Sequence, residues 1–508
     1  MESLLTVCIP MYNASSSIKK CLKSIKDSSV RVQIIVVDDN STDDSYNIVS
    51  SLGLDDITLV KNTYGKGPGP ARNVGIDICT TKYITFCDAD DFIPNFAYEK
   101  LLKVAIANES DMVIGQYLRK VDNSVWYTNK ELKNKYISDN YNHADDTQLI
   151  NITPSSCNKL YKLSVIKENN IYFQNSFLAE DLEFSTHCFL HSNVVNLLDD
   201  VVYFYYTYTS KDNIISSISL SRFTQGISCL ELTAKNMKIV NEKTFSYILN
   251  GSFKFFYNKL FLSSPADSIL MLIKMKEFLY KFKMLCNPFI IYSIIGKSLD
   301  AFLTCDMIDY YIEKKRDKKI TLESIKMDIE KKFKDDFLSI PVEYLDLYLN
   351  VLEKKGAYIM IMNLADELEQ KMEYRYLILT HKYKIFKTLK ILDKAYAICE
   401  ELLKLDDNSK YWFEMANLLK DTSKYDKAYH ILKNHINEND FLYWKLRAEL
   451  AEFIGNYEDA VYSWKNVARC NNMQFYNVLQ NIRSINSYEK NKFYNHISYT
   501  EDVVWKKI

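Results

Sequence analysis

The chain has 508 residues, of which 47% are hydrophobic and 25% charged, and its formal net charge is −1. This length predicts two to four domains, and the near-neutral charge argues against a protein that binds nucleic acid over a broad surface. Glycine (11) and proline (8) are scarce, which favours long helices over tight turns. The eleven cysteines are scattered without a C-x-x-C pair, so we expect buried thiols in a reducing compartment.

The ends of the chain and its apolar stretches bear on its location. The first ten residues lack the basic and cleavage regions of a signal peptide. The longest apolar stretch, 284–296, is too short for a bilayer span, which needs about 20 apolar residues. We therefore expect a cytoplasmic protein, one that can also lie peripherally at the inner face of the membrane.

Strands and helices alternate along the first part of the chain. The expected strands are Leu4–Pro10, Val32–Val37, Ile57–Val60, Tyr83–Cys87, Met112–Gln116, Val194–Leu198 and Val201–Tyr208. The expected helices are Ser15–Ser28, Asn40–Leu52, Ala71–Cys79 and Asn95–Asn108, with a glycine-rich loop at Asn62–Pro70 and a longer loop at 121–150. Apolar strands alternating with helices predict an α/β domain with a mostly parallel, Rossmann-like sheet covered on both faces.

From about residue 220 onward the sequence is helical in pattern. Amphipathic helices are expected at Ile227–Val240, Phe245–Leu262 and Ser268–Leu285, and the charged stretch Glu313–Asp336 is expected to be exposed helix and linker. We therefore divide the chain into an α/β domain at 1–215, a helical linker or accessory domain at 216–335, and a helical domain at 336–508.

A weak repeat marks the last of these parts. Ala395, Ala428 and Ala460 stand 33 and 32 residues apart, and Trp412 and Trp444 stand 32 apart. A period near 34 with small residues at fixed points is typical of tetratricopeptide-like helical hairpins. The full consensus is not met, so we predict degenerate repeats, with an ordinary helical bundle as the alternative.

The stretch Tyr83–Asp91 joins an apolar strand directly to three carboxylates. Ligands of open α/β sheets bind at the carboxyl edge of the strands, where these acids would lie. Asp88 and Asp90 are two residues apart, and carboxylate oxygens suit magnesium or manganese, which can in turn hold a diphosphate. A solvated turn is the alternative. Asp38 and Asp39 end a second strand at the same edge, and two acidic strand ends side by side favour a metal-bound nucleotide between them.

The glycine-rich loop between these acidic strand ends leads into a helix that carries Arg72. The loop is neither a P-loop nor a dinucleotide-binding fingerprint, because it lacks both the GK[ST] ending and the G-x-G-x-x-G spacing. An arginine at this place can hold a diphosphate with two hydrogen bonds, or an acid of the D-x-D turn. A purely structural salt bridge is the alternative.

Taken in order, these motifs resemble family 2 glycosyltransferases with the GT-A fold. The matching pieces are Val7–Asn13, Ile34–Asp43, Ala71–Gly75, Phe86–Asp91, Asn158–Tyr161, Glu180–Asp181 and Tyr203–Tyr208. They span about two-fifths of the chain and leave the C-terminal half without a counterpart.

The resemblance implies an inverting, metal-dependent transfer of a hexosyl or N-acetylhexosaminyl group from a nucleotide donor. By position, Pro10 and Tyr12 would frame the nucleoside, with Tyr12 stacked on the base. Asp39 would accept a hydrogen bond from the base, which suits uracil and a UDP-sugar. Arg72 would lie near the diphosphate or its surrounding acids, and Asp88 would contact the nucleotide.

The same resemblance assigns the metal and the base. Asp90 would hold a divalent metal, Mn2+ or Mg2+, which neutralises the leaving diphosphate. Asp181 would be the general base that removes the proton of the attacking hydroxyl. It lies near a helix start, where the dipole favours the ionised carboxylate. A helix-capping role is the alternative for Asp181.

The expected partners are a nucleotide-sugar donor and a glycan acceptor, and no nucleic acid. The acceptor would be a growing cell-surface polysaccharide, a teichoic-acid-like polymer, a lipid-linked glycan or a glycoprotein. The helical half would bind the acceptor, a partner enzyme or a second copy of the chain, because helical repeats present extended surfaces.

Two other classes of function stay open. In one, the transferase domain is inactive and the chain is a scaffold that acts through its repeats, although the presence of Asp39, Asp90 and Asp181 argues against this. In the other, the α/β domain is a nucleotidyltransferase. That chemistry usually needs a glycine-rich activating loop after the first strand, where Pro10–Asn13 stands instead.

Overall fold

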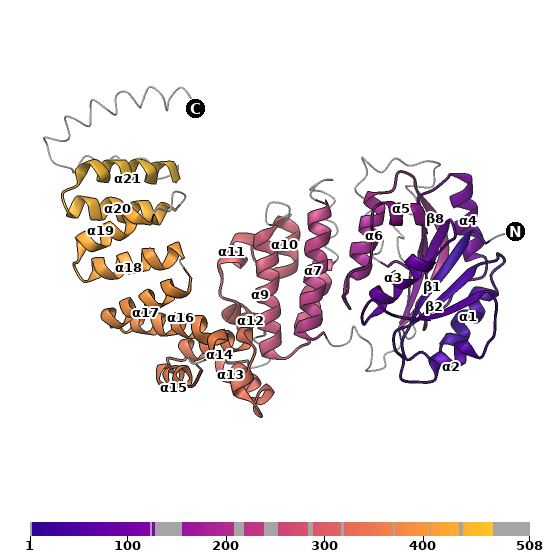
Figure 1. Cartoon of the computed structure of the whole chain (residues 1–508), viewed down its shortest axis with the longest axis horizontal. Coiled ribbons are helices and arrows are strands. Elements are labelled where there is room, and N and C mark those ends of the chain that lie inside the picture. Colours follow the sequence, from indigo (N-terminus) through magenta and orange to yellow (C-terminus); the bar gives the residue numbers. More distant parts are fainter. Residues whose placement is uncertain are drawn as a thin grey trace, which may run out of the picture. The chain divides into compact units, whose positions relative to one another are not determined.

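The computed structural model describes residues 3–121, 124–127, 155–207, 218–237, 252–282, 288–315, 320–368, 371–406, 408–435 and 440–470. The chain forms two compact units, Met1–Ser324 and Ile325–Ile508, which are considered one at a time (Figure 1). The three-domain division at 1–215, 216–335 and 336–508 stays a prediction.

The first unit is built on one sheet. Its strands are β1 Leu5–Met11, β2 Gln33–Asp38, β3 Ile57–Lys61, β4 Tyr83–Phe86, β5 Met112–Val121, β6 Ser124–Tyr127, β7 Lys159–Lys162 and β8 Val195–Thr207. They follow the order β3-β2-β1-β4-β7-β5-β6, with β8 paired to β5. The pairs among β3, β2, β1 and β4 are parallel, as is β5 with β8, whereas β7 runs antiparallel to both neighbours. The prediction of a mostly parallel α/β sheet is confirmed.

Three strand predictions need correction. The hairpin strand β6 lies inside the stretch 121–150 that was expected to be a loop, and residues 128–150 lie outside the described part. The four-residue strand β7 was not expected, because Lys159 and Lys162 stand at its two ends and leave no apolar run. The two strands expected at 194–208 form the single strand β8. Shifts in its pairing register with β5 around 199–200 accommodate the polar residues there without ending the strand.

Helices cover both faces of this sheet. They are α1 Ile18–Lys26, α2 Ser45–Ser50, α3 Pro68–Ile78, α4 Ala97–Ala107, α5 Leu163–Glu168 and α6 Glu180–Leu190. Figure 1 shows α1, α2 and α4 on one face and α3, α5 and α6 on the other. Helix α3 begins at Pro68, inside the predicted loop, because proline at the first helical position lacks only an N–H that would be unpaired there.

Two glycines let α3 approach its neighbours closely. A Cβ atom on Gly75 would lie 2.2 Å from the Sγ atom of Cys8 in β1. A Cβ atom on Gly69 would lie 2.6 Å from the carbonyl oxygen of Gln174, in the segment before α6. Helix α3 is therefore fixed between the centre of the sheet and the start of α6.

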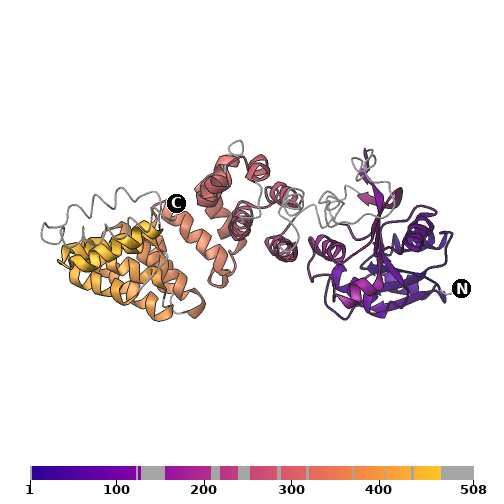
Figure 2. The ribbon, with the colours of Figure 1, turned by 90° about the horizontal axis from the view of Figure 1, so that it is seen from above.

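The first unit continues as a group of helices. They are α7 Leu220–Met237, residues 252–260, α9 Pro265–Lys281, α10 Pro288–Ile295, α11 Leu299–Thr304 and α12 Met307–Lys314. Helix α7 packs against both α6 and α9, and Figures 1 and 2 show α7 and α9 side by side. The helices expected between 227 and 285 are confirmed where the structure describes them. Throughout the described ranges, no helix combines the length and apolar character that crossing a membrane requires.

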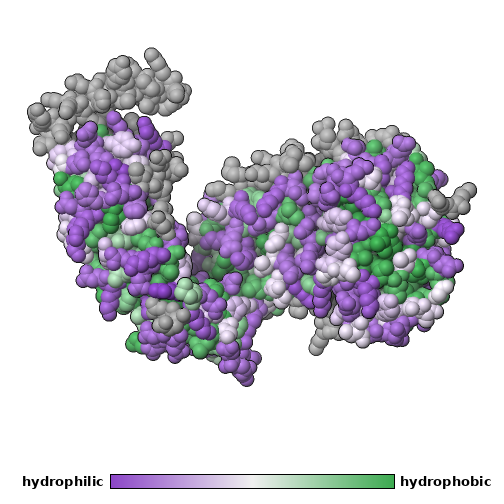
Figure 3. Space-filling model, in the orientation of Figure 1, coloured by the Kyte–Doolittle hydropathy of each residue, from purple (hydrophilic) through white to green (hydrophobic). Residues whose placement is uncertain are grey.

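The second unit is helical, and α13 spans the division between the units. The helices are α13 Leu322–Lys332, η4 Phe337–Ser339, α14 Val342–Lys354, α15 Tyr358–Leu368, α16 Met372–Thr388, α17 Leu392–Leu405, α18 Ser409–Asp421, α19 Tyr425–Asn434, α20 Phe441–Phe453 and α21 Tyr457–Cys470. From α16 to α21 each helix packs against the next, and the visible face of this unit is largely hydrophilic (Figure 3). Ala395, Ala428 and Ala460 are fully buried, as small residues between close helices would be. The tetratricopeptide-like assignment stays a prediction.

A buried histidine joins α14 to α16. The Nδ1 atom of His381 lies 2.5 Å from Oε1 of Glu353, and its Nε2 atom lies 3.0 Å from Oδ1 of Asp346. Burial lowers the pKa of His381, but the hydrogen bonds to the two carboxylates outweigh it and raise that pKa above its ordinary value. Lys384, 3.9 Å from Glu353, opposes the rise.

We predict that His381 makes the stability of the second unit depend on pH. A histidine whose pKa rises on folding contributes stability that is complete below about pH 6.5 and is lost as the pH rises through the folded-state value. His381→Gln should remove this slope. Thermal unfolding of the full chain from about pH 6 to about pH 9, followed by tryptophan fluorescence, measures it. Equal slopes for the parent and the variant would contradict the prediction.

Candidate active site

A buried arginine gathers three carboxylates at the carboxyl edge of the sheet. The side chain of Arg72, in α3, is 3% exposed. Its Nη2 atom donates to Oδ1 of Asp88 at 2.7 Å, and its Nη1 atom lies 3.1 Å from Oδ1 of Asp181 and 3.4 Å from Oε1 of Glu180. The guanidinium carbon lies 5.2 Å from the centre of the Phe173 ring. One cation therefore holds together the turn after β4 and the start of α6.

The three carboxylates differ in their access to solvent. The side chain of Glu180 is 9% exposed, whereas those of Asp88 and Asp181 are 32% and 26% exposed. Burial, and then the charge of Asp181, raise the pKa of Glu180 to about 7, against the opposing effect of Arg72. Burial alone would lower the pKa of Arg72, but Asp181 and Asp88 raise it, so the guanidinium stays charged. The acids that a ligand can reach are Asp88 and Asp181.

In the turn after β4, the two neighbouring acids Asp90 and Asp91 differ in burial. Asp91 is buried, and its Oδ2 atom accepts a hydrogen bond of 2.7 Å from the hydroxyl of Tyr203. The backbone N–H of Asp88 donates to the same hydroxyl at 3.2 Å. Asp90 faces outward, and its crowded surroundings together with the charge of Asp88 raise its pKa. Tyr203 and Asp91 therefore fix the turn, and Asp90 is left exposed on it.

Asp39 fixes the glycine-rich loop. It is buried at the end of β2, where its Oδ1 atom accepts from Nδ2 of Asn62 at 2.6 Å and its Oδ2 atom accepts from the backbone N–H of Gly67 at 2.8 Å. Gly67 has φ 125°, a conformation that glycine adopts without steric cost. The carboxylate of Asp39, predicted to contact the nucleotide base, thus also fixes the conformation of the loop that leads into α3.

Pro10 and Tyr12 lie at the end of β1. Pro10 is buried within the strand, and Tyr12, just beyond it, is 49% exposed, with Nζ of Lys66 5.8 Å from the centre of its ring. The next residue, Asn13, accepts a hydrogen bond of 2.8 Å from the backbone N–H of Thr42 through its side chain. Tyr12 therefore presents an exposed ring on a braced loop.

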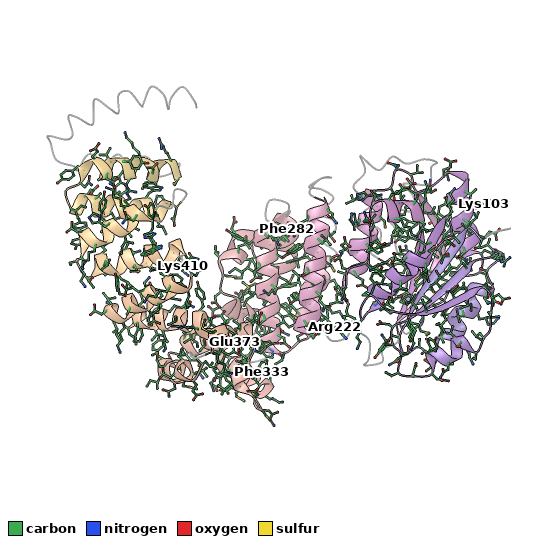
Figure 4. The ribbon with its side chains drawn as sticks, viewed as in Figure 1. Lys103, Arg222, Phe282, Phe333, Glu373 and Lys410 are labelled. Carbon is green, nitrogen blue, oxygen red and sulfur yellow. The ribbon has the colours of Figure 1, made fainter. Side chains whose placement is uncertain are left out.

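Helix α7 braces the site from beyond the predicted α/β domain. The side-chain oxygen of Gln225 accepts from the backbone N–H of Phe177 at 3.3 Å, and the guanidinium carbon of Arg222, labelled on α7 in Figure 4, lies 5.4 Å from the centre of the Phe177 ring. The same ring packs against Gly67, where a Cβ atom would lie 3.4 Å away. Contacts therefore run from α7 to the glycine-rich loop.

The structure thus brings three of the predicted site residues, Arg72, Asp88 and Asp181, into direct contact, and Asp39 is linked to Arg72 through Gly67 and α3. The sequence assigns no role to the partners Phe173, Ser156 and Asn62, and marks Glu180 and Tyr203 only as parts of matching motifs. Glu180 stands next to a predicted site residue, which was a usable signal, but a serine remote in sequence from its partner carries none.

A divalent metal fits this edge only together with a ligand. In the part of the chain that the structure describes, no three His, Cys, Asp or Glu side chains form a ready-made metal cage. Magnesium is often held by one or two carboxylates plus the phosphates of a substrate. Asp90, beside Asp88, can supply such a carboxylate.

Comparison with known proteins identifies the class of the first domain. Residues 6–169 match Glycosyl transferase family 2. The N-terminal region therefore contains a family 2 glycosyltransferase domain with the GT-A type of fold, followed by a helical region.

Curated relatives match the same region. Poly(ribitol-phosphate) beta-glucosyltransferase of Bacillus spizizenii is 29% identical over 212 residues, which are 40% of this chain and 32% of that protein. Poly(ribitol-phosphate) beta-N-acetylglucosaminyltransferase TarS of Staphylococcus aureus is 29% identical over 217 residues, 40% of this chain and 35% of that protein. This chain spans only part of the length of its curated relatives. For three of them, the matched region covers 32%, 61% and 31% of the relative's own length.

Among solved structures, the crystal structure of S. aureus TarS 1–349 in complex with UDP-GlcNAc is similar at 21% identity, with a TM-score of 0.49. That similarity covers 61% of this chain and 92% of the other.

We predict that Arg72→Met destabilises the first unit by about 3–5 kcal/mol, because it leaves the buried Glu180 and the partly exposed Asp88 and Asp181 without their counter-charge. Urea denaturation of the full chain near pH 8 measures the loss. Lys23→Met is the matched control, since Lys23 forms an exposed pair with Asp27 and should change stability little. Equal stability of the two variants would contradict a central role for Arg72.

Proposed function

We propose that the protein is an inverting glycosyltransferase that moves a sugar from a UDP-sugar donor to a hydroxyl group of a glycan acceptor. The observation that carries this proposal is the contact of Arg72 with both Asp88 and Asp181 at the carboxyl edge of the sheet. It brings an acid of the predicted donor site beside the acid proposed as the base. The family 2 domain and the names of the relatives support the same reaction.

In this proposal the donor lies along the carboxyl edge of β1, β2 and β4. Tyr12 stacks on the base with Pro10 beneath its loop, and Asp39 accepts from the base while it holds Gly67. Both oxygens of Asp39 already accept a hydrogen bond, but each carboxylate oxygen has a further lone pair to offer. Asp88 contacts the nucleotide, and Arg72 keeps Asp88 in place.

Asp90 holds the divalent metal, Mn2+ or Mg2+, together with the diphosphate of the donor. The bound metal would neutralise the charge that develops on the leaving diphosphate. The exposure of Asp90 supports this role, since a metal that binds with the nucleotide needs a carboxylate that it can reach from solvent.

Asp181 is the proposed general base. Inversion needs a single displacement at the anomeric carbon, so a carboxylate must accept the proton of the attacking hydroxyl on the face opposite the leaving group. The exposure of Asp181 and its position in the first turn of α6 support this role, because the helix dipole favours the ionised form. Glu180, buried beside it, also pairs with Arg72 and is not proposed as the base.

The acceptor is proposed to be a teichoic-acid-like polymer or a related cell-surface glycan. Two relatives are named as poly(ribitol-phosphate) glycosyltransferases, which supports a polymer acceptor. A glycoprotein stays a further candidate. We propose that the helical second unit binds the acceptor, a partner enzyme or another copy of the chain, and that the enzyme acts in the cytoplasm at the inner face of the membrane.

We predict that Asp181→Asn lowers transfer at least about a hundredfold, because the amide cannot accept the proton of the acceptor hydroxyl. Binding of UDP should stay within about threefold of the parent value, a change below 1 kcal/mol. UDP release from several UDP-sugars with manganese measures the first effect, and calorimetric titration with UDP measures the second. Transfer at the parent rate would refute the base assignment.

We predict that Asp90→Ala abolishes the metal dependence of donor binding, because it removes the carboxylate proposed to hold the metal. Titration of the parent and the variant with UDP, with manganese and with EDTA, measures it. Asp44→Ala, an exposed acid at the start of α2, is the matched control and should keep the parent's metal dependence. An unchanged metal effect in Asp90→Ala would exclude Asp90 as the ligand.

A further inference from the structure

Two donors reach the same oxygen of Asp181. Its Oδ1 atom accepts from Nη1 of Arg72 at 3.1 Å and from the hydroxyl of Ser156 at 3.0 Å. Within the described residues, Oδ2 takes no hydrogen bond. Two donors on one oxygen restrict rotation of the carboxylate, so the second oxygen is held in one orientation on a side chain that is 26% exposed.

Ser156 is itself held rigidly. It is fully buried in the turn before β7, beside Lys159, which is 3% exposed. The Nζ atom of Lys159 donates to Oδ1 of Asn158 at 2.9 Å and to the backbone carbonyl of Ser155, which closes the turn around Ser156. The side chain of Asn158 donates to the carbonyl oxygen of Gly115 at 2.6 Å, and this bond ties the turn to β5.

The hydrogen bonds of the buried lysine hold this turn together. Burial lowers the pKa of Lys159 to about 7, and the negative charge of Asp181 opposes this fall. The oxygens that accept these hydrogen bonds belong to the two residues that flank Ser156 and Cys157 in the turn. The position of the serine hydroxyl is therefore set by a small buried network and not by the surface of the site.

We propose that Ser156 is a positioning residue for the transfer reaction: its hydroxyl, acting with Arg72, aims Oδ2 of Asp181 at the acceptor hydroxyl. The proposal rests on the proposed function, since it assigns the base to Asp181. A general base must lie within hydrogen-bond reach of the proton it removes, and small errors in its placement are costly in rate. Ser156 is buried and contacts the base, so its effect falls on turnover and not on donor binding.

The test compares four variants of the full chain with the parent protein. The probe is release of UDP from UDP-glucose and UDP-N-acetylglucosamine with manganese, in which water replaces the unidentified acceptor. Ser156→Ala should lower kcat about tenfold and leave the KM for the donor within about twofold, as expected for one lost hydrogen bond to a charged group. Ser156→Thr keeps the hydroxyl and should recover most of the loss.

Ser110→Ala is the matched control. Ser110 is likewise fully buried, but its hydroxyl donates to Oδ1 of Asn196 at 2.6 Å and not to a residue of the proposed site, so kcat should stay at the parent value. Thermal unfolding of every variant shows whether it is folded. Because the extra methyl of threonine enters a buried site, Ser156→Cys, with a weak S–H donor of similar size, gives a second rescue and should fall between alanine and the parent.

Two results would overturn the proposal. One is a parent-like kcat for Ser156→Ala. The other is a loss of kcat in a destabilised variant that neither threonine nor cysteine repairs, which would mean that Ser156 acts only on folding. Failure of the proposed function is separate, because it would be seen in the parent protein, as binding of UDP without turnover of any donor.

Discussion

The ion pairs of Arg72 are the constraint on which the first unit depends. A buried guanidinium is stable only with its charge balanced, and buried carboxylates need the same balance in return. Arg72 sits in the centre of α3, Asp88 follows β4, and Glu180 and Asp181 begin α6. Because all three acids pair with the same arginine, α3, the turn after β4 and the start of α6 meet at one point of the sheet edge.

The backbone around this point is shaped so that the charges can meet. Gly69 leaves room for the segment before α6, and Ala179, directly before Glu180, has φ 62°, a left-handed conformation that costs an alanine roughly 1–2 kcal/mol. The strained residue Ala179 stands directly before α6, which begins with the two acids. The ion pairs that Glu180 and Asp181 form with Arg72 offset this strain, because they stabilise the conformation in which α6 starts.

Much of this arrangement could be predicted from the sequence, because it depends on local pattern. Apolar runs mark β1 to β4, and parallel strands bring their carboxyl ends together, so Asp39 and Asp88 were expected at one edge. The strand β7 was missed, since a lysine at each end leaves only Leu160 and Tyr161 as an apolar signal, whereas the equally short β4 is apolar throughout. Ser156 was missed for a different reason: its partner Asp181 is distant in sequence, and only the fold makes them neighbours.

The contacts of α7 illustrate the same limit. A change from strand to helix periodicity near residue 220 suggests that the transferase part ends there. Yet Gln225 of α7 holds the backbone of Phe177, and the Phe177 ring lies against Gly67, whose N–H binds Asp39. A chain cut at 215 would lose this support on the segment that connects the glycine-rich loop with the acids of α6. Sequence periodicity indicates the helix or strand to which a residue belongs. The extent of a site depends instead on the side chains that hold its loops. Here those side chains include residues of α7, which lies beyond the predicted α/β domain.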